Sequence, residues 1–315
     1  MVKKPRNIKV DGMRLPPVAV PEIYHEAVKF NPGKEDIIIA TYPKCGTTWT
    51  LQIVSLILRN GEPITNKEEF FTYVPFLELT PMEKISQMSK PRLLKTHLPF
   101  DPLKYNTEAK YIYIARHPAD HIVSFYHHLR FFTMYFFQDG TLEDVLSLFM
   151  AGEGDYNDFF DHLLAAYKYR NKPNVLLLTF ESMKADHRGA CLKIARFLGE
   201  EYHKRLLDDD EAVLKKVTEY SSLEYMKATV NEFLKHLLNA IPSEEDQKRN
   251  PVMKKIAELV QEAKEKGITS KGMFIRKGTT GDGKVSLSGE QLDRLKEHIR
   301  ERTTDSDVMS LWEDF

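Results

Sequence analysis

A group of residues suited to binding an oxyanion stands near the start of the chain, at Lys44, Gly46, Thr47 and Thr48. Lysine supplies a cation, glycine lets a ligand approach the backbone closely, and the two hydroxyl groups donate hydrogen bonds. Trp49 follows at once with a flat ring that can stack on a purine. These residues indicate a site for a phosphate- or sulfate-bearing ligand. The alternative is an ordinary turn with a solvated lysine.

The segments on either side of this group predict the elements that position it. Residues 37–40 are mostly β-branched and predict a buried strand, whereas residues 50–59 predict a largely apolar helix. A strand, a tight loop and a helix in this order direct loop N–H groups and the positive end of the helix dipole at one point, which favours an anion. The pattern G-x-x-x-x-G-K-[ST] does not occur, so the loop is not the Walker A loop of nucleoside triphosphatases.

A candidate general base, His97, lies at the end of a second short strand, which begins at Arg92 and is stopped by Pro99. Alternate residues of a strand point the same way, so Lys95 shares a face with His97. In open α/β sheets, functional side chains gather just beyond the carboxyl ends of the strands. A lone histidine is usually structural or merely exposed, but the lysine beside it favours a catalytic role.

Two further groups of polar residues suit phosphate binding. Arg116 ends a predicted strand, and Ser124 lies on the helix that follows it, so both could reach one anion. A salt bridge at the strand end is the alternative for Arg116. Arg276, Lys277 and Gly278 stand close to further glycines, a composition that suits a nest of converging N–H groups. A basic surface turn is the alternative there.

The composition of the 315-residue chain restricts its class. Apolar residues make up 42%, enough for a sizeable core, and a net charge of −1 gives no reason to expect nucleic acid or an anionic membrane as partner. Two cysteines, Cys45 and Cys191, argue against a disulfide framework and structural zinc. The chain starts without an apolar signal segment, and no stretch approaches the ~20 apolar residues of a membrane span. We expect a soluble protein of a reducing compartment.

Taken in order, these motifs resemble those of the cytosolic sulfotransferases. Residues 42–49 read Tyr-Pro-Lys-Cys-Gly-Thr-Thr-Trp and match the family's phosphosulfate-binding loop except at Cys45, where the family usually has serine. Residues 95–99 match the K-T-H-L-P motif, and Arg116 begins a match to R-x-x-x-D-x-x-V-S-[YF]-Y-H. Residues 276–282 match R-K-G-x-x-G-D, so the resemblance covers most of the chain.

The resemblance implies a P-loop-kinase-like sulfotransferase fold: one α/β domain over residues 1–315, with a central parallel sheet and helices on both faces. It implies transfer of the sulfuryl group of 3′-phosphoadenosine 5′-phosphosulfate (PAPS) to the hydroxyl or amine of a small acceptor, in the cytoplasm and without a metal. His97 corresponds to the catalytic base, and Lys44 and Lys95 would stabilise charge on the transferred group. The residues implied to bind the donor are Lys44, Cys45, Gly46, Thr47, Thr48, Trp49, Arg116, Ser124, Phe180, Ser221, Arg276, Lys277 and Gly278.

The acceptor side is matched less closely. Phe76 falls in a segment similar to the family's V-P-F-L-E, which lines the acceptor pocket; from the residues alone, the edge of the core is the alternative. The aromatic run over residues 127–138 is typical of a core helix, yet Arg130 interrupts it, so part of it could line a cleft. There His128 replaces a phenylalanine of better-known relatives. Phe76, His128 and Phe132 favour a small aromatic acceptor, such as a phenol or a monoamine.

Some positions depart from the family pattern. Phe180 stands where the family often has a tyrosine that contacts the adenine, and Gly283 replaces a tryptophan after the basic turn. The family's dimer motif is poorly kept after Lys284, which leaves homodimerisation open. Cys45 allows two interpretations. Its thiol is reactive because a helix N-terminus and a cation favour the thiolate, or it is a buried and inert substitute for serine.

Three segments lie outside the matched motifs. Residues 1–35 predict an arm with one short helix. Over residues 230–272, roughly, the chain runs longer than the family norm, and its Lys/Glu-rich part, residues 247–267, shows no apolar face broad enough for a core helix. We interpret this insertion as an extended lid or a surface excursion. Residues 155–169 predict a further helix.

Other functions fit the residues less well. A degenerate protein that only binds PAPS or an acceptor has no need of the base and cations at His97, Lys44 and Lys95. An ATP-dependent kinase would need the Walker lysine, which is missing. A sulfotransferase of sterols or alkyl alcohols stays open, because residue types alone do not give the shape of a pocket. The expected partner is a small-molecule acceptor, with no nucleic acid and no membrane.

Overall fold

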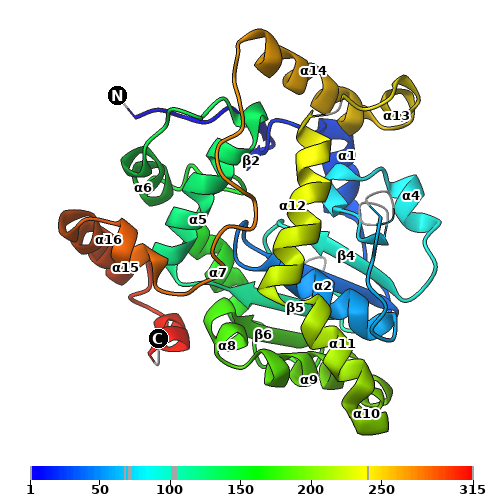
Figure 1. Cartoon of the computed structure of the whole chain (residues 1–315). Coiled ribbons are helices and arrows are strands. Elements are labelled where there is room, and N and C mark those ends of the chain that lie inside the picture. Colours follow the sequence, from blue (N-terminus) through cyan, green and yellow to red (C-terminus); the bar gives the residue numbers. More distant parts are fainter. Residues whose placement is uncertain (1, 67–68, 70–72, 101–104, 240, 314–315) are drawn as a thin grey trace.

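Four parallel strands form the centre of the computed structural model, which describes residues 2–66, 69, 73–100, 105–239 and 241–313 (Figure 1). They lie in the order β4-β3-β5-β6. Ile37 of β3 pairs with Leu93 on one side and with Lys110 on the other. The expected α/β fold with a central parallel sheet is confirmed. The strand bounds are Asp36–Thr41 for β3, Arg92–Thr96 for β4, Lys110–Ala115 for β5 and Val175–Thr179 for β6.

The side chains of β3 are all buried and alternate between two hydrophobic cores. Ile37 and Ile39 belong to one core, and Ile38 and Ala40 belong to the other. Helices therefore cover both faces of the sheet, which explains why this strand is an unbroken apolar run. The core of Ile37 includes residues of α2 (Thr47–Leu58), α8 (Phe180–Ala185), α9 (His187–Leu198), α10 (Glu200–Leu207) and α11 (Ala212–Tyr220).

Most of the remaining helices contribute to the core of Ile38. Its residues come from α1 (Pro21–Lys29), α4 (Met82–Ser86), α5 (Pro118–Phe131), α6 (Leu142–Met150), α7 (Phe159–Tyr167), α12 (Leu223–Asn239), α14 (Pro251–Glu265) and α16 (Gly289–Arg302). Short helical segments are η1 (Leu77–Leu79), η2 (Thr133–Tyr135), η3 (Asp209–Glu211), α13 (Glu244–Arg249), α15 (Asp282–Ser286) and η4 (Val308–Trp312). Because α2 and α5 follow adjacent strands and pack on opposite faces, a crevice forms where β3 and β5 end.

The N-terminal segment packs into the protein more closely than an arm would. Two short strands, β1 (Ile8–Val10) and β2 (Met13–Leu15), form an antiparallel hairpin before α1, and Leu15 is fully buried. The Arg6 guanidinium pairs with the carboxylate of Glu262 on α14, with 2.9 Å between Nη2 and Oε1. The first residues therefore hold the insertion in place.

The expectation that the insertion lacks a broad apolar face is wrong. Figure 1 shows α12 as the link between α11 and the insertion helices α13 and α14. Lysine and glutamate side chains occupy the outer face of α14 and obscure its apolar stripe in the sequence. The stripe makes α14 a core helix with a charged outer surface. Its buried residues are Val252, Ile256, Ala257, Leu259, Val260 and Ala263.

The helix predicted over residues 155–169 begins later than expected. α7 starts at Phe159, and the Asp158 side chain caps it by accepting two backbone amides. Tyr156 and Asn157 have φ angles of 64° and 65°, a conformation that a helix does not contain. These residues form a tight turn, and that turn contributes side chains to the functional site.

Candidate active site

A cavity of about 900 Å³ opens at the carboxyl end of β3, where β4 and β5 also end. Ligands of open α/β sheets usually bind at this place, and the volume lies near the top of the range of ligand pockets, about 300–1,000 Å³. Cys45 is the one predicted site residue that does not line it. Those that do are Lys44, Gly46, Thr47, Thr48, Trp49, Phe76, Lys95, His97, Arg116, Ser124, His128, Phe132, Phe180, Ser221, Arg276, Lys277 and Gly278.

The turn after β3 is shaped by two residues with positive φ angles, Lys44 at 66° and Gly46 at 110°. Gly46 is the N-cap of α2, and a Cβ there would lie 3.2 Å from the Phe180 ring. Thr47 Oγ1 lies 2.5 Å from Thr41 Oγ1, which ties the start of α2 to the end of β3. The turn thus presents the N-terminus of a 12-residue helix to the cavity, an arrangement that binds anions.

Two lysines reach the cavity, Lys44 from the turn after β3 and Lys95 from β4. Lys44 Nζ lies 3.7 Å from the centre of the Phe274 ring, and Lys95 Nζ lies 4.5 Å from the centre of the Phe76 ring. Burial, aided by the charges of Arg116 and Lys95, lowers the pKa of Lys44 to about 7. Burial lowers the pKa of Lys95 to about 8. A bound anion favours the charged form of both lysines and would raise these pKa values again.

His97 is held in one orientation. Its Nδ1 lies 2.7 Å from the carbonyl oxygen of Thr41, so Nδ1 carries the proton and donates, and Nε2 keeps its lone pair. The rings of Phe76 and Tyr156 flank the imidazole, with centroids 5.0 and 5.3 Å away. Burial lowers the pKa of His97 to about 3, which keeps the ring neutral near pH 7. A neutral imidazole with one lone pair is the form that a general base requires.

Arg116 joins two loops at the end of β5. Its guanidinium donates to the carbonyl oxygens of Lys44 at 3.2 Å and Thr279 at 3.3 Å, and its carbon lies 4.4 Å from the centre of the Phe180 ring. The Nε atom is buried and has no hydrogen-bond partner among the described residues. Arg116 Nε is therefore available to donate a hydrogen bond to a phosphate ligand.

Arg276 and Lys277 form a second basic group at the cavity. Both pair with the carboxylate of Asp282, and Lys277 Nζ lies 2.6 Å from Oδ1. Arg116 contacts Thr279 of the same turn, so cations from distant parts of the chain meet around one region of the cavity. Such a cluster suits an anion that carries more than one negative charge.

Aromatic side chains form a wall beside this basic region. The Trp49 ring centroid lies 5.5 Å from that of Phe180 and 5.2 Å from that of His187. Trp49 Nε1 donates to the backbone carbonyl of Ser221 at 2.9 Å, and the buried Ser221 hydroxyl donates to Val217 O at 2.6 Å. The backbone carbonyl of Ser221 thus fixes the tryptophan ring, while the Ser221 hydroxyl is already engaged in a hydrogen bond within the protein. Flat rings of this kind suit a purine.

The predicted acceptor residues lie on the other side of the cavity. The His128 ring centroid is 4.9 Å from that of Phe132 and 6.1 Å from that of Phe274, a ring that sequence reasoning did not single out. Phe131 is buried in the core, whereas Phe132 lines the cavity. The aromatic run therefore serves both the core and the cleft.

Residues 34–256 match the model of the family described as "Sulfotransferase domain", which is well over half of the chain. The chain belongs to the sulfotransferase family. It is 34% identical to "Sulfotransferase 1B1" of Canis lupus familiaris, a match that covers 85% of this chain and 83% of the relative. It is 30% identical to "Sulfotransferase 1 family member D1" of Rattus norvegicus, with 91% and 90% covered.

A solved structure supports the fold of this sulfotransferase. The crystal structure of mouse sulfotransferase SULT7A1 complexed with PAP superposes with a TM-score of 0.69 at 24% sequence identity. The match covers 98% of this chain and 99% of that chain. The α/β architecture expected from the motifs is therefore shared over the whole length of both proteins.

Glu78 belongs to the site of this sulfotransferase and was not predicted. Its fully buried carboxylate accepts the backbone amide of His97 at 2.7 Å. Burial raises the pKa of Glu78 to about 7, while the charge of Lys95 favours the ionised form. An acidic residue within the apolar run 74–79 was the available signal.

Asp120 on α5 was also missed. Its buried carboxylate accepts the backbone amides of Gly281 at 2.8 Å and Gly283 at 2.7 Å. A Cβ at Gly283 would lie 2.5 Å from the backbone of Ala119, so α15 approaches α5 too closely for a side chain there. This contact accounts for glycine at position 283, and the aspartate of the R-x-x-x-D motif was its signal.

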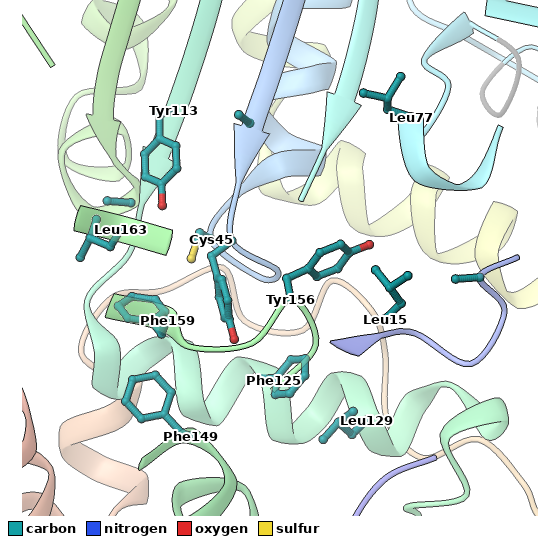
Figure 2. Close-up of a cluster of buried hydrophobic side chains, with 14 of the residues drawn as sticks. Leu15, Cys45, Leu77, Tyr113, Phe125, Leu129, Phe149, Tyr156, Phe159 and Leu163 are labelled. Atoms are coloured by element: carbon teal, nitrogen blue, oxygen red, sulfur yellow. The ribbon is translucent and has the colours of Figure 1, made fainter. Parts of the chain in front are cut away.

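Cys45 belongs to the core and not to the cavity. It is 1% exposed, and Figure 2 shows its sulfur among core side chains near Tyr113 and Leu163. Burial raises the pKa of Cys45 to about 12, and burial raises that of Cys191 to about 12 as well. The reactive-thiol interpretation is therefore wrong. Burial destabilises the thiolate by more free energy than the charges of the nearby cations supply.

Among the described residues, no helix combines the length and apolar character that a membrane crossing needs. The same residues contain no group of three or more His, Cys, Asp or Glu side chains placed to hold a metal ion.

Proposed function

We propose that this sulfotransferase transfers the sulfuryl group of PAPS to the hydroxyl or amine of a small aromatic acceptor, with His97 as general base. The observation that carries the proposal is the orientation of His97. Thr41 engages its Nδ1 proton and leaves the Nε2 lone pair available, in a cavity that also holds Lys44 and Lys95.

The donor half of the proposal rests on charge and shape. The start of α2 and Lys44 suit the 5′-phosphosulfate, because loop amides and a cation converge there. Arg116, Arg276 and Lys277 suit the 3′-phosphate, and the ring of Trp49 suits the adenine. Arg116 Nε has no hydrogen-bond partner among the described residues, and a bound anion could accept its proton in a hydrogen bond. The same anion would stabilise the charged form of Lys44 and raise its lowered pKa.

The residues of the chain then have separate tasks. PAPS supplies the transferable sulfuryl group. His97 Nε2 would take the proton of the acceptor hydroxyl as its oxygen bonds to sulfur, while the bond from sulfur to the 5′-phosphate oxygen breaks and adenosine 3′,5′-bisphosphate leaves. General-base catalysis of this kind commonly contributes about 10²–10⁴-fold in rate. Lys44 and Lys95 place positive charge where negative charge develops, and the enclosed cavity strengthens that interaction.

The aromatic acceptor is supported by Phe76 and Tyr156, whose rings flank the base, and by Phe132, which lines the same cavity. Sterols and alkyl alcohols are the competing acceptors, and a protein that binds without turnover is the competing function. Three further statements stay predictions: a single domain over residues 1–315, a cytoplasmic location and a reaction that needs no metal. Homodimerisation stays open.

Incubation of the purified protein with radiolabelled PAPS and a panel of phenols, monoamines, sterols and alkyl alcohols tests the proposal. We expect label to appear in aromatic acceptors first. A higher rate with alkyl alcohols or sterols than with every aromatic compound would contradict the acceptor class. Tight binding of adenosine 3′,5′-bisphosphate without transfer to any acceptor would instead favour the binding protein.

A further inference from the structure

Asp155 is a carboxylate in the cavity wall, and among the described residues one of its oxygens has no hydrogen-bond partner. The residue is 3% exposed and lines the same cavity as His97. Its Oδ2 accepts a hydrogen bond from the Tyr135 hydroxyl at 2.6 Å, whereas Oδ1 is buried without a partner among the described residues. Burial raises the pKa of Asp155 to about 7. A buried carboxylate oxygen without a hydrogen-bond donor lowers the stability of the folded protein. A ligand that donates a hydrogen bond to it would remove this penalty and bind more tightly.

The hydrogen-bond chain continues from Tyr135 to His128. Tyr135 gives its proton to Asp155, so the phenol oxygen is left to accept, and His128 Nε2 lies 3.4 Å from it. Burial lowers the pKa of His128 well below 6.5, so the ring is neutral and carries one proton. That proton belongs on Nε2, which leaves Nδ1 as an acceptor. The Nδ1 atom is also buried without a partner among the described residues.

We propose that Asp155, Tyr135 and His128 form a subsite for an ammonium group of the acceptor. Within these three residues, Asp155 Oδ1 and His128 Nδ1 are buried acceptors that have no hydrogen-bond partner among the described residues. An ammonium has three donors and no acceptor, and its charge complements the carboxylate. A neutral hydroxyl would satisfy one acceptor and bring no charge, so the carboxylate would keep only the attraction of the Arg14 charge. Of the three residues, sequence reasoning identified His128 alone.

The subsite lies close to the base. Tyr156 follows Asp155 in the chain, and its ring centroid is 5.3 Å from that of His97. Burial lowers the pKa of His128, and the charge of nearby Lys44 lowers it further. The inference rests on the proposed function, since the hydroxyl that receives the sulfuryl group must reach His97 while the ammonium binds Asp155. It narrows the acceptor to a hydroxylated aromatic compound with a short cationic side chain.

Tyramine and 4-ethylphenol test the subsite, because they share a phenol ring and a two-carbon side chain and differ by the amine. With PAPS as donor, we expect kcat/KM for tyramine to exceed that for 4-ethylphenol about 10- to 100-fold, the effect of one hydrogen bond to a charged group. Asp155→Asn should abolish the preference by raising the KM for tyramine. The kcat/KM for 4-ethylphenol should stay within about twofold of the unmutated enzyme. The control Asp139→Asn removes a largely exposed carboxylate, and it should change kcat/KM for neither substrate.

The outcomes separate the subsite from the proposed function. Equal kcat/KM for the two phenols in the unmutated enzyme overturns the subsite, and so does a preference that survives Asp155→Asn. Transfer to neither phenol contradicts the proposed function instead. Should Asp155→Asn fail to fold, Tyr135→Phe replaces it: this change removes the hydroxyl that links Asp155 to His128, and the preference for tyramine should fall while 4-ethylphenol is still sulfated. An unchanged preference in Tyr135→Phe counts against the subsite.

Discussion

The carboxylate of Asp120 on α5 accepts the backbone amide of Gly283 at 2.7 Å, a contact between residues 163 positions apart in the chain. The same carboxylate accepts the amide of Gly281, so the turn with Arg276 and Lys277 is fixed to α5. The basic turn therefore has a defined position relative to the end of β5, and its two cations can act together with those of the strand.

Asp120→Asn should raise the KM for PAPS about tenfold or more. The neutral amide cannot accept two backbone N–H groups as a carboxylate does, and a hydrogen bond to a buried charged group is worth about 1.5–3 kcal/mol. Initial rates at varied PAPS concentration measure the effect. Asp139→Asn, which removes a largely exposed carboxylate, serves as the control. A KM for PAPS equal to that of the control would show that the turn does not depend on Asp120.

His97→Ala should lower the turnover number about 10²–10⁴-fold and leave the affinity for adenosine 3′,5′-bisphosphate almost unchanged. The base acts on the acceptor proton, and the nucleotide makes no use of it. Isothermal titration and single-turnover rates separate binding from chemistry. Retention of more than about half of the rate would remove His97 from the mechanism.

Arg276→Ala should raise the KM for PAPS more than the KM for the acceptor. A lost charge-assisted bond to the 3′-phosphate corresponds to about 2–3 kcal/mol. The unmutated enzyme should bind adenosine 3′,5′-bisphosphate far more tightly than adenosine 5′-phosphate, and the variant should lose much of this difference. Equal affinity of the unmutated enzyme for both nucleotides would refute the donor assignment itself.

The donor side could be predicted because its information is local. Lys44, Gly46 and Trp49 are near neighbours in the sequence, and a strand, turn and helix fix where they point. The same holds for Arg116, which follows a strand directly. The strands lie where the sequence predicts them for the same reason, since the apolar runs of parallel strands are long and distinct.

The remaining features depend on contacts that a sequence does not reveal. Asp155 becomes part of the site because a tight turn replaces the start of the predicted helix and because Tyr135 meets it from a different segment. The positive φ angles of Lys44 and Gly46 decide which way the Cys45 side chain points. No sequence motif predicts that direction. The apolar stripe of α14 was hidden by charged residues on its opposite face.

Donor binding should weaken as the pH rises from 7 to 9. The pKa values of Lys44 and Lys95 are lowered to about 7 and about 8, so both lysines lose their protons, and their attraction for anions, within this range. Above its pKa, each lysine that binding must protonate raises the Kd of adenosine 3′,5′-bisphosphate about tenfold per pH unit. Lys44→Arg keeps its charge and should flatten the rise. A Kd that stays constant from pH 7 to 9 would contradict the role of these cations.

Cys45 and Cys191 should both react slowly with iodoacetamide, and bound nucleotide should not change the rate for Cys45. Both thiols are buried, and burial raises the pKa of each to about 12, so little thiolate forms near neutral pH. Timed labelling with peptide mapping gives the two rates. Rapid labelling of Cys45 alone, blocked by adenosine 3′,5′-bisphosphate, would restore the reactive-thiol interpretation.

The pairing of Arg6 with Glu262 has a practical consequence for handling this protein. Arg6 also donates its backbone amide to Tyr135 O at 2.8 Å and places its guanidinium 3.8 Å from the centre of the Phe136 ring. The first few residues thus brace both α14 and the segment that carries Tyr135. We expect a change that removes the Arg6 contacts to alter the acceptor side of the cavity more than the donor side. Protein prepared for acceptor screening should therefore keep Arg6 and its neighbours unchanged.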